Sequence, residues 1–185
     1  MPKLSDRVQT FTDSVIRRMT RISDEHGAIN LSQGFPDFDP PKPILDALAK
    51  VAYEGPHQYS VTYGAENLRE ALARKASKAM QREIDPETQV VVTCGGTEAM
   101  MGVVMSICNP GDKIMVFSPF YENYSADAIL SGAEPIFIPL VPPTYEFDIN
   151  LIEDGFKQGA KAIIVCNPSN PCGKVFTEEE LLAIG

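Results

Sequence analysis

Apolar side chains recur along this chain with two spacings that alternate from one segment to the next. Apolar residues at helical spacing predict helices over residues 5–25, 43–53, 66–82, 97–108, 121–130 and 150–157, and from Thr177 onward. Short apolar runs between them predict strands over residues 89–93, 113–117, 135–139 and 161–166. Strands that alternate with helices predict an α/β fold, a mostly parallel sheet with helices on both faces.

Turn and capping residues mark the ends of several of these elements. Residues 30–43 form a loop dense in Gly, Pro and Asp, and the helix that follows it starts on Pro43. Thr177 and Glu180 have the spacing of a capping box, which predicts the start of the last helix. The chain shows no internal repeat or low-complexity segment.

Composition narrows the class of protein. The 185 residues, with 44% hydrophobic and 22% charged side chains, suffice for one good-sized globular domain or one and a part. A net charge of −9 argues against a nucleic-acid partner, because phosphate backbones require clustered Lys and Arg. The polar amino terminus and the lack of a membrane-length apolar run lead us to expect a cytoplasmic protein without a membrane partner.

Cysteine and histidine usage predicts neither disulfides nor a metal site. The four cysteines lie in or beside apolar segments and are interpreted as reduced thiols: Cys94, Cys108, Cys166 and Cys172. The two histidines, His26 and His57, are far apart in the sequence and match no zinc-site spacing.

The most informative motif is the loop Asn-Pro-Ser-Asn-Pro-Cys-Gly at residues 167–173, which follows the predicted strand 161–166. Open α/β sheets bind ligands at the carboxyl ends of their strands. Two prolines stiffen the loop, so the amide of Asn170 can be aimed at a fixed point. The alternative is a plain turn between a strand and a helix.

A second motif, Thr-Cys-Gly-Gly-Thr-Glu at residues 93–98, joins a predicted strand to a predicted helix. Glycines allow close backbone approach, and the free N–H groups at a helix start suit a phosphate. A tight turn that binds nothing is the alternative. Glu98 would repel a phosphate, so we expect its side chain to point away. Dinucleotide and P-loop patterns fit poorly.

Three further segments carry candidate residues. Residues 118–124, Ser-Pro-Phe-Tyr-Glu-Asn-Tyr, place aromatic side chains after a predicted strand, where aromatic residues usually join the core. Residues 30–38 contain Gly34 in a Gly/Pro turn, and residues 58–64 contain Tyr59 before a glycine, followed by Leu-Arg-Glu at residues 68–70. Taken singly, each of these segments is uninformative.

Taken in order, the five blocks resemble class I/II aminotransferases, which are pyridoxal-phosphate (PLP) enzymes of fold type I related to aspartate, aromatic and kynurenine aminotransferases. The usual family loop reads Asn-Pro-Thr-Gly, and Cys172 replaces its threonine. The resemblance implies pyridoxal 5'-phosphate as cofactor. By this resemblance, Gly96 and Thr97 would donate hydrogen bonds to the cofactor phosphate, Tyr121 would stack on the cofactor ring, and Asn170 would hydrogen-bond the phenolic oxygen of the ring. Tyr59 would bind the phosphate of the neighbouring subunit, and Gly34 and Asn170 would bind the substrate. Phe120 is then expected to be a core residue.

The resemblance also shows what the chain lacks. The family's catalytic lysine, which bonds covalently to PLP, lies well after the asparagine loop, as do the aspartate at the pyridinium nitrogen and the substrate-carboxylate arginine. No lysine up to Gly185 stands in that context, so no catalytic residue is assigned within these residues. We expect the 185-residue chain alone to be inactive.

The resulting expectation is the amino-terminal half of a PLP-dependent aminotransferase that moves an amino group from an L-amino acid to a 2-oxo acid. Residues 1–45 would belong to the small α/β domain with the substrate loop, and residues 46–185 to an incomplete large domain. The intact enzyme would be a homodimer with shared active sites, completed by the missing carboxyl-terminal half. Alternatives are a PLP-dependent β-lyase of the same fold and a non-catalytic phosphate- or nucleotide-binding α/β module.

Overall fold

The computed structural model describes residues 3–9, 11 and 13–185 of the chain. The chain divides into two compact units. One consists of residues 94–185 together with the described residues before Asp13, and the other consists of residues 13–93. The predicted small-domain segment, residues 1–45, includes positions 1, 2, 10 and 12, which lie outside the described residues. The predicted domain boundary at residue 45 stays a prediction.

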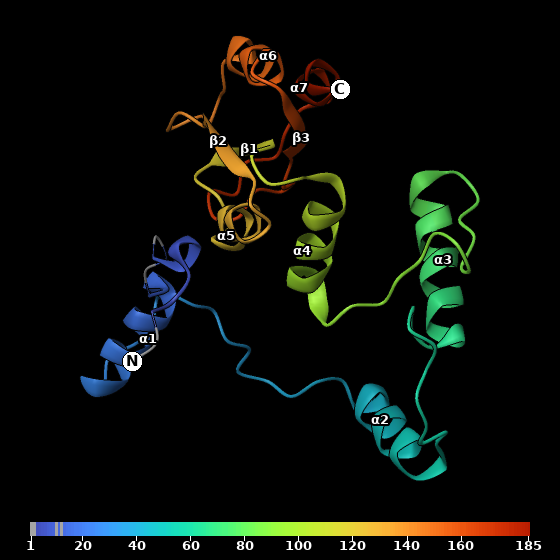
Figure 1. Ribbon diagram of the computed structural model, residues 1–185. Coiled ribbons are helices and arrows are strands. Elements are labelled where there is room, and N and C mark those ends of the chain that lie inside the picture. The colour runs from blue at the N-terminus through green and yellow to red at the C-terminus, as the bar shows by residue number, and fades with distance from the viewer. Residues whose placement is uncertain (1–2, 10, 12) are drawn as a thin grey trace. The chain divides into compact units, whose positions relative to one another are not determined.

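A parallel sheet forms the centre of the first unit (Figure 1). Its three strands are β1 (Lys113–Ser118), β2 (Glu134–Pro139) and β3 (Ala160–Ile164), in the order β2-β1-β3. Strand β1 runs parallel to both neighbours and is the most deeply buried of the three. Three of the four predicted strands are therefore confirmed, as is the parallel α/β class.

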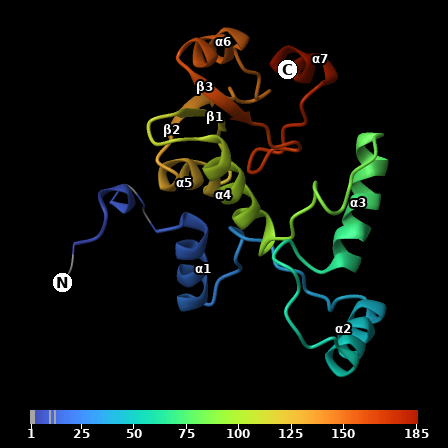
Figure 2. The same cartoon turned by 45° about the vertical axis from the view of Figure 1, so that its right-hand side comes forward.

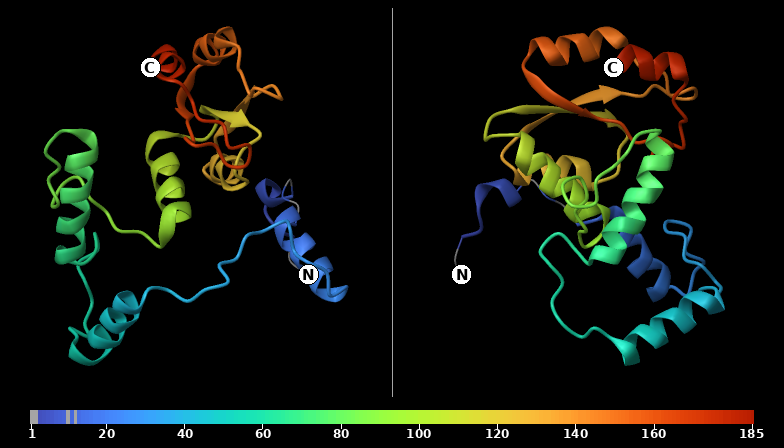
Figure 3. Two further views of the ribbon diagram at one scale, coloured as in Figure 1. Left: turned by 180° about the vertical axis from the view of Figure 1, so that it is seen from behind. Right: turned by 90° about the vertical axis from the view of Figure 1, so that its right-hand side faces the viewer.

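Helices cover both faces of this sheet. Helices α4 (Gly95–Ile107) and α5 (Asn123–Leu130) lie on one face, and α6 (Ile149–Lys157) and α7 (Glu178–Ile184) lie on the other (Figures 1 and 3). Successive side chains of a strand point to opposite faces. Ile114 accordingly packs with Val104 and Ala128 of α4 and α5, whereas Met115 packs with Ile152 of α6.

Two helices of this unit begin on side-chain caps. Thr177 and Glu180 form the predicted capping box of α7, with the Thr177 hydroxyl accepting the Glu180 N–H and the Glu180 carboxylate accepting the Thr177 N–H. The Asp148 carboxylate caps α6 by accepting the Asn150 N–H at 2.9 Å. Such caps satisfy N–H groups that the helix itself cannot pair. The capping box thereby fixes the start of α7, the helix that follows the asparagine loop.

The second unit contains helices α1 (Val15–Glu25), α2 (Lys42–Glu54) and α3 (Glu66–Met80) (Figure 2). Buried Arg69 of α3 donates to the carbonyls of Gly64 and Pro86 and to the Glu87 carboxylate. Gly64 has a φ of +109°, and a Cβ there would lie 2.5 Å from Val92. Glycine is therefore required at this close approach, which fixes the turn after Tyr59.

Two sequence predictions about elements were wrong. Residues 89–93 form no strand in the described part of the chain. Their apolar character fits a strand, but a strand needs a paired neighbour. Here the Val92 N–H donates to the Tyr63 carbonyl and the Gln89 N–H to the Asp85 carbonyl, in loops rather than in a sheet. The predicted helix 5–25 is also divided, into a 3-10 turn, η1 (Asp6–Val8), and α1, with positions 10 and 12 outside the described residues.

Within the described residues, no helix combines the length and apolar character that crossing a membrane requires.

Candidate functional site

The first part of the site is the start of helix α4. Gly95, its first residue, has a φ of +83°, a conformation that favours glycine. Gly96 and Thr97 follow in the first turn, where N–H groups have no partner inside the helix and the helix dipole is positive. The Glu98 carboxylate accepts the N–H of Cys94, the residue before the helix. This end of α4 therefore offers backbone donors to an anion.

The start of helix α5 meets the start of α4 at one hollow of about 300 Å³. It is lined by residues of the two helix starts and by Tyr121, two residues before α5: Gly96, Thr97, Met100, Tyr121, Asn123 and Tyr124. The Asn123 side-chain amide donates to the Thr97 hydroxyl at 2.7 Å. Tyr121 is half-buried and lies edge-on to Tyr124, with ring centroids 5.8 Å apart and an interplanar angle of 75°. The hollow thus combines the start of a helix with an aromatic wall.

The second part of the site is the asparagine loop after β3. The buried Ser169 N–H donates to the Lys174 carbonyl, and the Gly173 N–H donates to the Ser169 carbonyl, both at 2.8 Å. The Asn167 side chain accepts the Phe176 N–H at 3.1 Å, so the first asparagine of the motif holds the loop. Within the described residues the Asn170 side chain makes no hydrogen bond and is exposed, which leaves its amide available to a ligand.

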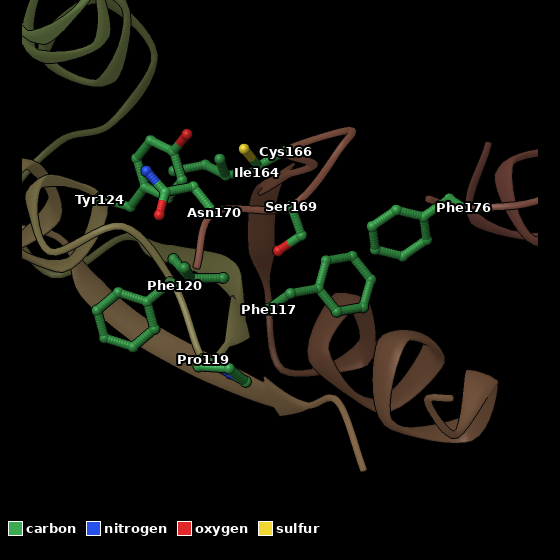
Figure 4. Close-up of a pocket in the computed structure, with 10 residues that line it drawn as sticks. Phe117, Pro119, Phe120, Tyr124, Ile164, Cys166, Ser169, Asn170 and Phe176 are labelled. Atoms are coloured by element: carbon green, nitrogen blue, oxygen red, sulfur yellow. The ribbon is translucent and has the colours of Figure 1, made fainter. Parts of the chain in front are cut away.

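Tyr124 connects the two parts. Its ring lines the α4–α5 hollow and also a small cavity of about 10 Å³ beside Asn170, where Figure 4 shows the two side chains next to each other. A hydrogen bond with the Cys166 thiol, together with burial and the nearby Asp127 carboxylate, raises the pKa of Tyr124 to about 12. The Cys166 thiol in turn donates to the Pro168 carbonyl at 3.4 Å. Tyr124 therefore stays a neutral phenol bonded to Cys166, the residue before the asparagine loop.

No lysine is among the residues that line these two hollows. Lys161 pairs with Asp112 at 2.6 Å, and Lys174, after the asparagine loop, pairs with Glu180 at 2.7 Å. Burial tends to raise the pKa of Glu180, but the hydrogen bonds from Lys174 and Thr177 outweigh it and hold that pKa below its ordinary value. Lys174 is therefore held in an ion pair with α7, directly after the loop.

The structure brings some of the predicted site residues together and not others. Gly96, Thr97 and Tyr121 line one hollow, and Asn170 lines the neighbouring cavity that shares Tyr124. Gly34 and Tyr59 belong to the other unit, and both are exposed. Tyr59 is 100% exposed and lines an open hollow with His57 and Gln58. Their assigned roles stay predictions.

Sequence reasoning missed three residues of the α4–α5 hollow, Met100, Asn123 and Tyr124. Asn123 and Tyr124 lie in the same aromatic block as Tyr121, and Tyr124 is one helical turn beyond it. The available signal was Asn123, a polar residue near the start of a predicted helix and close to Tyr121, the candidate for ring stacking. Phe120, expected in the core, is half-buried and stacks on Phe137 of β2 with centroids 5.1 Å apart.

The chain is similar to known proteins both in sequence and in structure. The family described as "Aminotransferase class I and II" matches residues 26–185. Probable N-succinyldiaminopimelate aminotransferase DapC of Mycobacterium tuberculosis is 34% identical over 180 residues, covering 96% of this chain and 45% of its own length. Kynurenine–oxoglutarate transaminase 3 of Mus musculus is 33% identical over 193 residues, covering 98% of this chain and 42% of its own length.

A solved structure of Escherichia coli YbdL, for which a methionine aminotransferase function was identified, superposes with a TM-score of 0.91 at 29% identity, covering 100% of this chain and 48% of that one. The chain belongs to the class I and II aminotransferase family and has the fold of its type I members. It spans about half the length of the curated relatives it matches. Family membership implies PLP as the cofactor.

Proposed function

We propose that this chain supplies the phosphate cup and ring platform of a PLP-dependent aminotransferase, which moves an amino group from an L-amino acid to a 2-oxo acid. The observation that carries the proposal is the α4–α5 hollow. There Gly96 and Thr97 at a helix start lie with Tyr121 in one lining. A phosphorylated aromatic cofactor needs those two features side by side.

The residues present fit this cofactor. An ideal Cβ on Gly96 would meet no atom within 4 Å, so the space above this glycine is open to a phosphate group. The N–H groups of Gly96 and Thr97 and the Thr97 hydroxyl would donate to the phosphate oxygens. Tyr121 would hold the ring face, and the Asn170 amide would donate to the phenolic oxygen. PLP itself supplies an electron sink for the substrate carbanion.

The remaining catalytic groups would come from sequence beyond residue 185. The relatives are about twice as long as the part matched here, and no lysine lines either hollow. The covalent lysine, the pyridinium aspartate and the substrate arginine are assigned to that second half. Tyr59, fully exposed, is assigned to the phosphate of a neighbouring subunit in a homodimer, and Gly34 to the substrate carboxylate. Four unpaired cysteines fit a reducing cytoplasm.

The test uses the full-length protein that carries this chain. Loaded with PLP and given a panel of L-amino acids and 2-oxo acids, it should transfer the amino group, detected by mass spectrometry of the products. Replacing Tyr121 by Leu should weaken PLP binding, because stacking on an aromatic face is lost. A protein that binds PLP but converts the amino acids only to elimination products would overturn the transaminase assignment.

A further inference from the structure

Asn123 is the first residue of α5, and its side chain is directed at the other helix. It lies 26 positions from Thr97 in the sequence, yet its amide donates to the Thr97 hydroxyl at 2.7 Å. Asparagine at a helix start commonly accepts a backbone N–H of its own helix. Helix α5 has Glu122 as its N-cap and no side-chain cap bond, so Asn123 is not used in that way.

The direction of this bond fixes what the Thr97 hydroxyl can do. A threonine hydroxyl has one proton to donate and lone pairs that accept. When the Asn123 amide donates to the oxygen, one lone pair is occupied and the hydroxyl proton must be donated elsewhere. Thr97 and Asn123 both line the α4–α5 hollow, so an anion there is an available acceptor.

We propose that Asn123 is a positioning residue for phosphate binding, orienting the Thr97 hydroxyl as a donor to the cofactor phosphate. The inference rests on the proposed function. It adds a residue from the aromatic block to the phosphate site and assigns it a role through Thr97. The Asn123–Thr97 bond joins the start of α5 to the start of α4 beside this hollow.

The experiment measures equilibrium binding of pyridoxine 5'-phosphate and of pyridoxine to the full-length protein without its cofactor. Both probes lack the aldehyde and cannot bond to lysine, so binding reports the non-covalent site. Thr97→Val should lower affinity for the phosphate ester by about 10- to 100-fold, since a hydrogen bond to a charged group is lost. Asn123→Ala should lower it by about 3- to 10-fold, as expected for one neutral hydrogen bond.

Three comparisons make the test specific. Pyridoxine affinity should be unchanged by Asn123→Ala, because that probe has no phosphate. Asn123→Ala should cause no further loss when Thr97 is already Val. Asn123→Asp should weaken phosphate binding by about 10-fold or more, because a carboxylate accepts the hydroxyl proton and repels the anion. The matched control is Asn67→Asp in the first turn of α3, which should leave affinity unchanged.

The possible failures are distinguishable. If Thr97→Val binds the phosphate ester as tightly as the unaltered protein, the phosphate-cup assignment itself is wrong. If Thr97→Val weakens binding but the Asn123 variants do not, only the positioning role is overturned. An Asn123→Ala loss of equal size in the Thr97→Val background also overturns it, because the two residues would then act independently. Asn123→Ser provides a second variant should Asn123→Ala fail to fold.

Discussion

Replacing Gly96 by alanine separates the needs of the fold from those of the cofactor. Gly96 is the second residue of α4, and a Cβ built there meets nothing within 4 Å. Gly95 differs, because its φ of +83° strains any other residue. The fold therefore tolerates alanine at Gly96, and alanine is favoured over glycine within a helix by about 0.5–1 kcal/mol. Gly96→Ala should leave the free energy of unfolding unchanged or slightly raised.

The same methyl group would occupy the space assigned to the phosphate. Displacing the phosphate from one N–H donor costs about 1.5–3 kcal/mol, the net value of a hydrogen bond to a charged group. A loss of that size corresponds to a fall in PLP affinity of about 10- to 100-fold. The predicted result is therefore a protein of equal or greater stability that binds its cofactor much more weakly.

The assay combines urea unfolding of the cofactor-free protein with equilibrium binding of PLP. Gly102→Ala provides a matched control, because Gly102 lies in the same helix, is exposed and also has no atom within 4 Å of an ideal Cβ. It should alter stability in the same direction and leave PLP affinity unchanged. Unchanged PLP affinity in Gly96→Ala, with the control behaving as expected, would refute the placement of the phosphate.

Three further predictions concern packing, ionisation and the missing half. Gly155→Ala should lower the unfolding free energy by about 1–3 kcal/mol in urea titrations, because a Cβ there collides with the Met115 sulfur in the core. Burial without a partner for one oxygen raises the pKa of Asp127. Its contribution to stability is thus complete below the unfolded pKa of about 3.9 and lost as pH rises through the folded pKa. Asp127→Asn should therefore exceed the unaltered protein in stability by about 1–3 kcal/mol near neutral pH, with the gap closing in acid. A persistent gap in acid would contradict this. Finally, the 185-residue chain alone should show no transaminase activity and no PLP adduct at a specific lysine after borohydride reduction, as judged by peptide mass spectrometry.

Local sequence signals predicted much of the sheet and of the site. The apolar run that forms β1 and the capping box at Thr177 each depend on neighbouring residues, and each was found where expected. Helix α4 begins at Gly95, two residues before the predicted start at Thr97. The neighbouring positions of Tyr121 and Asn170 then follow, because each comes after one of the parallel strands β1 and β3, whose carboxyl ends lie at one edge of the sheet.

What the sequence could not predict depends on partners distant in the chain. The apolar pattern at residues 89–93 indicates burial but does not say which strand pairs with it, and in the described residues none does. The Asn123–Thr97 bond joins residues 26 positions apart and leaves no local pattern. The link from Tyr124 to Cys166 is of the same kind, since only the fold brings α5 beside the end of β3.

The most direct test of the central claim is a crystal structure of the full-length protein with PLP bound. The account predicts that the phosphate accepts hydrogen bonds from the Gly96 and Thr97 amides. It also places the ring against Tyr121 and its phenolic oxygen on the Asn170 amide. A phosphate bound at any other helix start, or a ring that contacts neither Tyr121 nor Asn170, would contradict it.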